Sequence, residues 1–286
     1  MESIQVFCGI NSMGVPFSRS NRKHIGYYDI IVQDLKSNYD VSGFNISSLS
    51  KNCTWDFMKI LDENIGILQI RNLQVYGYNK LRNANILFKL VIPKNFQDVM
   101  KFNDVEDIGL KTLIEKSNNP IFLYNGGQND FFTFIQAGPV ELLNKRVRDS
   151  LPDNLEELVF QSIDNVEKNW LALYSINPNV KILSYGIYNS PLFNKINNII
   201  KIQNYLKRAD MRYDNGFKYM VDLYNRLICE RADKYDFVYY VPLDFMVDYC
   251  STMDFHPNTK GNELIAETSL DIINSEILKN KRVGRN

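Results

Sequence analysis

Short apolar runs that alternate with segments of helical periodicity constrain the fold of this chain more than any other feature of its sequence. The apolar runs cover residues 4–8, 41–47, 119–127, 180–188 and 235–243. Amphipathic or helix-rich segments cover residues 27–39, 54–63, 154–176, 193–232 and 258–280. Strands that alternate with helices pair in parallel through right-handed crossovers. The sequence therefore predicts an α/β fold, a three-layer α/β/α sandwich around a parallel sheet of about five strands.

No internal repeat, low-complexity tract or linker rich in Pro, Gly and Ser divides the chain, so we expect a single domain over residues 1–286. Hydrophobic residues make up 45% of the composition, which is enough for a substantial core. Residues 70–116 lack a clear strand pattern and predict a mainly helical insertion in this domain. Thr54 stands where the N-cap of the second helix is expected.

The charge balance and the cysteines narrow the choice of partners and compartment. Lys plus Arg and Asp plus Glu both number 33, whereas a nucleic-acid binder normally shows a basic excess, so no nucleic-acid partner is expected. No secretory signal is visible, and no apolar run is long enough to predict a transmembrane segment. The four cysteines form no C-x-x-C pair, so we expect reduced thiols and a cytoplasmic location. The sequence leaves the oligomeric state open.

The first strand runs into GINSMGVP, residues 9–16, a turn of small residues that resembles a phosphate-binding loop in its glycine spacing. Val15 and Pro16, however, occupy the positions of the Lys and Ser/Thr of such a loop, so the cation for the β- and γ-phosphates is missing. A flavodoxin-like nucleotide-binding module is therefore weakly supported. The chain also lacks a G-x-S-x-G motif, which argues against an α/β-hydrolase with a nucleophile elbow.

The third strand ends in FLYNGGQNDFF, where Gly126 and Gly127 allow a tight turn before Asn129 and Asp130. A preorganised Asn amide can stabilise a developing oxyanion by about 3 kcal/mol. Gly, Asn and Asp are also ordinary turn formers, so a turn that only closes the strand is the other interpretation of this stretch.

His256 and His24 are the two histidines of the chain. His24 lies in a basic, polar approach to a helix and is expected to be exposed. Asp254 precedes His256 by two positions, and such a carboxylate can hold an imidazole in one tautomer and stabilise the imidazolium. In the alternative, Asp254 caps the last helix and His256 is part of the polar surface. With so few histidines and no cysteine pair, no metal site is expected.

The serine, the asparagine and the Asp–His pair are stronger evidence for one site when they are considered together. A serine follows the first strand, an asparagine follows the third, and an Asp–His pair precedes the last helix. A parallel α/β fold brings these positions to the carboxyl edge of its sheet. Serine, asparagine and histidine at one edge are the groups required for acyl transfer by a serine nucleophile.

These stretches make the sequence resemble the SGNH hydrolase superfamily of GDSL-type esterases and lipases, over nearly the whole chain. GGQND is similar to the family's G-x-N-D motif, and DFHPNTKGNELIA is similar to its C-terminal Asp–His block. INSMGV resembles the first block, G-D-S-x-G-V, with Ile10 for Gly and Asn11 for Asp, which places Ser12 at the nucleophile. A register anchored on Gly9 would place Asn11 there and leave the protein inactive.

The sequence departs from the family pattern at two further points. The second block of the family contributes a glycine N–H to the oxyanion hole, but SLSKNCTWD has no glycine, and Asn52 is the nearest equivalent. Asn tolerates a left-handed backbone better than most residues. In addition, one residue separates Asp254 from His256, where the family usually has two.

The resemblance implies a flavodoxin-like sheet and an esterase in which His256, beside Asp254, takes the proton of Ser12. Asp130 is expected to brace the turn around Asn129. Neither a metal ion nor an organic cofactor is implied. The implied catalytic residues are Ser12, His256 and Asp254, and the implied oxyanion hole involves Ser12, Asn52, Gly127 and Asn129.

The resemblance also bounds the substrate, because the family includes lipases, thioesterases, carbohydrate deacetylases and acyltransferases. We expect a small or carbohydrate ester, since nothing in the sequence suggests attachment to a membrane. The aromatic-rich residues 76–88 and 131–134 could line an acyl or sugar pocket, or belong to the core. The alternatives are a catalytically inactive binding protein on the same fold and an acyltransferase that uses the same residues.

Overall fold

A computed structural model describes residues 2–9, 25–47, 54–67, 69–70, 108–127, 130, 155–189, 216–250 and 256–279 of the chain. Residues 71–107 and 131–154 lie outside the described residues, and with them lie the aromatic-rich stretches and most of the predicted insertion.

The described residues form a five-stranded sheet in the order β2-β1-β3-β4-β5, in which every neighbouring pair is parallel. This order is the flavodoxin-like one, so the predicted fold class is confirmed. The strands are β1 (Ser3–Gly9), β2 (Asp40–Asn45), β3 (Pro120–Tyr124), β4 (Lys181–Tyr185) and β5 (Val238–Val241).

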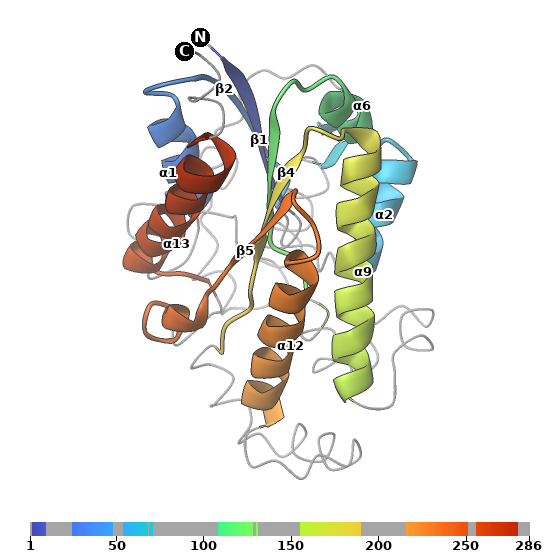
Figure 1. Ribbon diagram of the computed structural model, residues 1–286, viewed down its shortest axis with the longest axis vertical. Coiled ribbons are helices and arrows are strands. Elements are labelled where there is room, and N and C mark those ends of the chain that lie inside the picture. The colour runs from blue at the N-terminus through green and yellow to red at the C-terminus, as the bar shows by residue number, and fades with distance from the viewer. Residues whose placement is uncertain are drawn as a thin grey trace, which may run out of the picture.

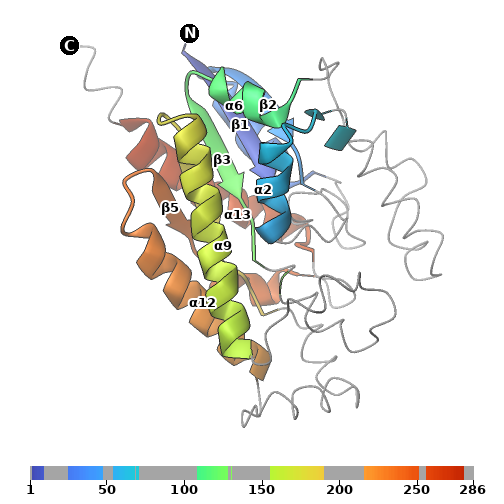
Figure 2. The same cartoon turned by 90° about the vertical axis from the view of Figure 1, so that its right-hand side faces the viewer.

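Helices cover both faces of the sheet, as Figures 1 and 2 show. On one face lie α1 (Tyr27–Leu35) and α13 (Thr259–Ile272), which continues into the π-helical turn η4 (Ile273–Ile277). On the other face lie α2 (Thr54–Asp62), α6 (Leu110–Glu115), α9 (Leu155–Ile176) and α12 (Gly216–Ala232). A short 3₁₀ helix, η3 (Asp244–Asp248), follows β5. None of the described helices is long and apolar enough to cross a bilayer.

The central strand β3 is apolar along its whole length because both of its faces are buried. Successive side chains of a strand point to opposite faces, so β3 divides its residues between two cores. Ile121 and Leu123 pack with α1 and α13, whereas Phe122 and Tyr124 pack with the helices of the other face. The sheet is therefore held between two hydrophobic layers, and polar side chains gather beyond the ends of its strands.

The two ends of the segment that contains the predicted insertion lie side by side. Gly66 and Gly109 form an antiparallel bridge, and the N–H of Ile67 donates to the carbonyl of Ile108 over 3.0 Å. Directly after this bridge, α6 packs with α2 and α9 and buries Leu110 and Ile114 in the core. The organisation as one domain with a helical insertion stays a prediction.

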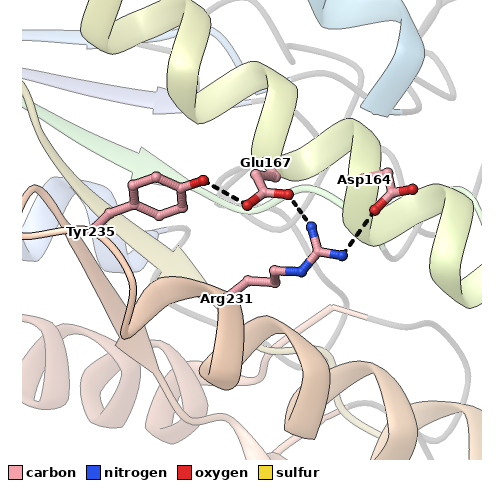
Figure 3. A network of polar contacts seen from close by, with 4 residues as sticks. All are labelled: Asp164, Glu167, Arg231 and Tyr235. Atoms are coloured by element: carbon pink, nitrogen blue, oxygen red, sulfur yellow. Dashed lines mark hydrogen bonds and ion pairs between the residues drawn. The ribbon is translucent and has the colours of Figure 1, made fainter.

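A polar network joins α9 to the C-terminal end of α12, as Figure 3 shows. Arg231 contacts the carboxylates of Asp164 and Glu167, and the hydroxyl of Tyr235 donates to Glu167 over 2.6 Å. The hydrogen bond to this carboxylate raises the pKa of Tyr235. Because Arg231 and Asp164 are partly exposed, solvent screens the network, and its contribution to stability is small.

Candidate active site

The carboxyl ends of β1 and β3 lie side by side at the point where the strand order reverses. In open α/β sheets of this kind, ligands bind in the crevice outside that point. Here the N–H of Asn125, just past β3, donates to the carbonyl of Gly9 at the end of β1 over 2.8 Å. On the other side of β1, the N–H of Ile46 donates to the carbonyl of Cys8 over 2.7 Å. The loops that follow the first three strands therefore start from one closely bonded edge.

Several predicted site residues lie outside the described residues. They are Ser12 and its rival Asn11, the oxyanion-hole residues Asn52 and Asn129, Asp254, and the second histidine, His24. Gly127, Asp130 and His256 are described, as are the segments that lead into and out of each loop. The structure thus shows how the described segments next to these residues are held, and the roles of the residues outside it stay predictions.

Gly127, in the predicted G-x-N-D motif, has a backbone conformation that requires glycine. Its φ of +95° lies in the left-handed region, and a Cβ at this position would lie 2.3 Å from the hydroxyl of Tyr224. That hydroxyl donates to the carbonyl of Gly126 over 3.2 Å, and the N–H of Asp130 closes a turn onto the carbonyl of Gly127 over 3.0 Å. The motif therefore fixes a defined turn at the end of β3.

Asp130 is fully buried and accepts hydrogen bonds from two helices. Its carboxylate receives the N–H of Thr54 at 2.9 Å, the hydroxyl of Thr54 at 2.7 Å and the hydroxyl of Ser162 at 2.6 Å. A carboxylate is favourable at the positive N-terminus of a helix, and bonds to a charged acceptor are stronger than neutral ones. These contacts agree with the expectation that Asp130 has a bracing role.

The expected N-cap role of Thr54 needs correction. Thr54 is the first residue of α2, and the oxygen that receives its N–H belongs to Asp130. The side chain of Asn169 adds a second tie, because its Nδ2 donates to the carbonyl of Thr54 at 2.8 Å and to the hydroxyl of Tyr124 at 2.7 Å. The start of α2, two positions after Asn52 in the sequence, is thus fixed to β3 and α9.

Sequence reasoning missed Ser162 and Asn169, two buried polar residues on α9. They are seven positions apart, and Val166 and Leu173 continue the same buried stripe of the helix. Polar residues on the apolar stripe of an amphipathic helix are the signal that could have found them, because a buried polar group needs a partner.

His256 lies on the turn between η3 and α13, at the carboxyl edge of the sheet. Cys250 and Pro257 form an isolated bridge across this turn, and the N–H of Asn258 donates to the carbonyl of Tyr249 over 2.8 Å. Both ring nitrogens of His256 are buried, although the residue as a whole is half-buried. This shielding argues against the alternative in which His256 is only part of the polar surface.

The alternative in which Asp254 caps the last helix is wrong. The N-cap is Asn258, whose side chain accepts the N–H of Gly261 at 2.8 Å, and it is not Asp254. A Cβ on Gly261 would lie 2.6 Å from the carbonyl oxygen of Tyr249, so the close packing of the turn requires glycine there. The P-N-x-x-G portion of the motif is therefore explained by the way the His256 turn is built.

A neutral polar cluster lies beneath the ends of the first three strands. The hydroxyl of Tyr27 accepts from Nδ2 of Asn125 at 2.8 Å, and the thiol of Cys8 contacts that hydroxyl and the hydroxyl of Ser47. Burial raises the pKa of the Cys8 thiol to about 12, so this cysteine is not a nucleophile at neutral pH. Among the described residues, no group of three or more His, Cys, Asp and Glu side chains could hold a metal ion.

Comparison with known proteins points to one family. The family model described as GDSL-like Lipase/Acylhydrolase matches residues 17–268. This range includes Asn52, Gly127, Asn129, Asp254 and His256 but begins after Ser12, so the match does not bear on the register of the first block. No functionally curated protein matches the chain.

The solved structures that this chain resembles are distant from it in sequence. The lipase Lip_vut3 from a goat rumen metagenome is 12% identical with a TM-score of 0.51, over 95% of this chain and 97% of that one. A GDSL-like lipase, described as putative, from Parabacteroides merdae is 12% identical with a TM-score of 0.48, over 94% of each chain. An extracellular lipase from Streptomyces rimosus is 9% identical with a TM-score of 0.47, over 96% of this chain and 100% of that one. At 12% identity the likeness to Lip_vut3 concerns the fold alone.

Proposed function

We propose, from the premise that this chain belongs to the GDSL-like lipase/acylhydrolase family, that it is an esterase with Ser12 as its nucleophile. Membership of that family supports hydrolysis of acyl esters. The identity of the nucleophile, the oxyanion hole and the substrate are the proposed parts.

The observation that carries the proposal is that His256 and the G-x-N-D turn both lie at the carboxyl edge of the sheet. His256 has buried ring nitrogens and lies on a turn at the carboxyl edge of the sheet, where the ends of β1 and β3 are bonded together. The turn after β3 is fixed by Gly127 and Asp130 at that same edge. A histidine that can act as a base and a turn that can bind an oxyanion, both at this edge, are what a serine that follows β1 would need, and this supports the proposal.

In the proposed first step, the hydroxyl oxygen of Ser12 attacks the ester carbonyl carbon while His256 accepts the hydroxyl proton, with Asp254 orienting the imidazole. The N–H of Ser12, the N–H near Asn52 and the side-chain amide of Asn129 stabilise the oxyanion. The intermediate then collapses, the C–O bond to the alcohol breaks, and His256 returns the proton to the leaving alcohol. Water releases the acyl group from Ser12 by the same steps, which regenerates the serine.

Hydrolysis of p-nitrophenyl acetate by the wild-type protein and by Ser12→Ala tests the nucleophile. We expect kcat/KM to fall by at least about 1,000-fold in the variant, because removal of the nucleophile ends covalent catalysis. Ser175→Ala is the matched control, since Ser175 is exposed on α9 and donates to the carbonyl of Ala172, three positions before it. Equal rates in the wild type and Ser12→Ala would contradict the proposal.

A fluorophosphonate probe separates the two registers of the first block. Labelling should be lost in Ser12→Ala and in His256→Ala but kept in Asn11→Ala, because the probe reacts only with an activated serine. A wild-type protein that the probe does not label, or a Ser12→Ala variant that keeps its labelling, would contradict the assignment of Ser12.

The proposed substrate is a small or carbohydrate ester. Rates with p-nitrophenyl acetate, p-nitrophenyl decanoate and acetylated xylan test this part separately. A higher kcat/KM for the decanoate than for both acetyl esters would overturn the substrate class and leave the nucleophile standing.

A further inference from the structure

Asn262, in the first turn of α13, joins the His256 turn to the start of α1, the helix packed beside it in Figure 1. The side chain is 2% exposed. Its Oδ1 accepts the N–H of Tyr27 at 3.0 Å, and its Nδ2 donates to the carbonyl of Pro257 at 3.2 Å and to the carbonyl of Asn258 at 3.0 Å. One amide group therefore bonds both to the turn that carries His256 and to the N-terminus of another helix.

The N-terminus of α1 needs this acceptor. The first N–H groups of a helix have no partner within the helix, and side chains or water have to receive them. The N-cap of α1 is Gly26, which has no side-chain oxygen. Asn262 supplies the missing acceptor from 235 positions away in the sequence.

From Tyr27 the connection continues to the ends of the strands. The hydroxyl of Tyr27 accepts from Nδ2 of Asn125 at 2.8 Å, and the N–H of Asn125 donates to the carbonyl of Gly9 at 2.8 Å. A continuous series of bonds thus links Pro257, which directly follows His256, through Asn262, Tyr27 and Asn125 to the end of β1.

We propose that Asn262 is a positioning residue, whose amide holds the turn with His256 in place against the ends of β1 and β3. The proposal rests on the proposed function, in which His256 must meet a serine on the loop after β1. Acyl transfer requires a base within hydrogen-bond reach of its nucleophile, and small misplacements of such groups reduce turnover strongly. The amide orients the base and does not touch the reacting atoms.

Asn177 provides a matched control at the opposite edge of the sheet. It is 5% exposed, and its Nδ2 donates to the carbonyls of Ile114 and Ser117 at 2.8 and 2.7 Å. Its Oδ1 accepts the N–H of Asn179 at 3.0 Å. Asn177 therefore makes the same kinds of bond as Asn262, but it lies before β4, away from the carboxyl edge.

The experiment compares kcat and KM for p-nitrophenyl acetate in the wild type, Asn262→Ala and Asn177→Ala, well below the melting temperature of each protein. We expect both variants to melt at a lower temperature. In Asn262→Ala, kcat should fall at least tenfold with KM within twofold of the wild type, whereas Asn177→Ala should keep kcat within twofold.

Asn262→Ser keeps the experiment decisive if Asn262→Ala fails to fold. Thr268 and Ser269 in the same helix donate to the carbonyls four positions before them, so a serine at position 262 should bond to Asn258 in the same way. It is too short to bond to Tyr27 and Pro257 as well, so kcat should still fall at least fivefold.

The outcomes separate the two proposals. A wild-type chain without Ser12-dependent hydrolysis would overturn the proposed function and this inference with it. An active wild type with an unchanged kcat in Asn262→Ala or Asn262→Ser would overturn this inference alone, as would an equal loss of kcat in Asn177→Ala.

Discussion

The two edges of the sheet use buried polar side chains in opposite ways. At the carboxyl edge, Asp130 and Asn262 present oxygen atoms to the N–H groups of Thr54 and Tyr27, where α2 and α1 begin. At the amino edge, Asn177 presents its Nδ2 to the carbonyls of Ile114 and Ser117, where α6 ends. In a parallel α/β sandwich the helices start at the carboxyl edge and end at the amino edge, so the unpaired backbone groups differ in kind.

This difference explains why the carboxyl edge suits the proposed chemistry. Helix N-termini attract negative charge, and they direct unpaired N–H groups toward the loops that follow the strands. Here two of these termini are fixed by side chains from the motifs at the end of β3 and at the start of α13. The residues that hold the edge together therefore come from the same motifs as the candidate catalytic groups.

Asp130→Ala should have the largest effect on stability, because it removes the acceptor of three buried donors on Thr54 and Ser162. We expect the free energy of unfolding to fall by about 4 kcal/mol. Denaturation by urea at neutral pH measures it. Asp164→Ala is the matched control, since that carboxylate is 53% exposed and should matter by less than about 1 kcal/mol. Losses of equal size in the two variants would contradict the bracing role.

The strand and helix order of the fold was predictable because periodicity is a local property of the sequence. The apolar run of residues 4–8 became β1, and the segment 154–176 became α9, with ends that differ by one residue or so. The caps were less predictable. Thr54 looks like an N-cap by its position, yet its N–H is received by Asp130, which lies 76 residues away. No local pattern contains such a partner.

In the candidate site, too, local features were predictable and long-range partners were not. The glycine at position 127 could be anticipated from the motif, and its φ of +95° gives the physical reason. The burial of Asn262 could also be anticipated, because this polar residue lies on the same stripe of α13 as Ile265, Ala266 and Ser269. Its partner Tyr27 lies in another helix, and only the folded chain brings the two together.

Asn177→Asp replaces a hydrogen-bond donor at the amino edge with an acceptor. It should have the second-largest effect on the free energy of unfolding. The variant places a carboxylate against the carbonyls of Ile114 and Ser117, at the negative end of α6, so we expect a loss of about 3 kcal/mol at pH 7. The folded state would raise the pKa of the new carboxyl group. The loss should therefore be smallest below about pH 4, where the group is protonated and can donate, and grow as the pH rises.

Urea denaturation of Asn177→Asp and Asn177→Ala at several pH values measures this effect. Asn177→Ala lacks a titratable group and should show a loss that does not change with pH relative to the wild type. A loss in Asn177→Asp that is independent of pH would show that the donor role of Asn177 is not what stabilises the amino edge.

Arg231→Met should have the smallest effect on the free energy of unfolding. It tests whether burial is what makes the polar contacts at the two edges stabilising. Arg231 contacts two carboxylates between α9 and α12, which is more charge than Asn262 or Asn177 engages, but its side chain is 30% exposed. Screening by solvent reduces such pairs, so we expect a loss of less than about 1 kcal/mol that shrinks further in high salt. A double-mutant cycle of Arg231→Met with Glu167→Gln, followed by urea denaturation, isolates the pair. A coupling free energy as large as the loss in Asn177→Ala would mean that charge compensates for exposure, because the partly exposed network in Figure 3 would then stabilise the fold as much as a buried, uncharged contact.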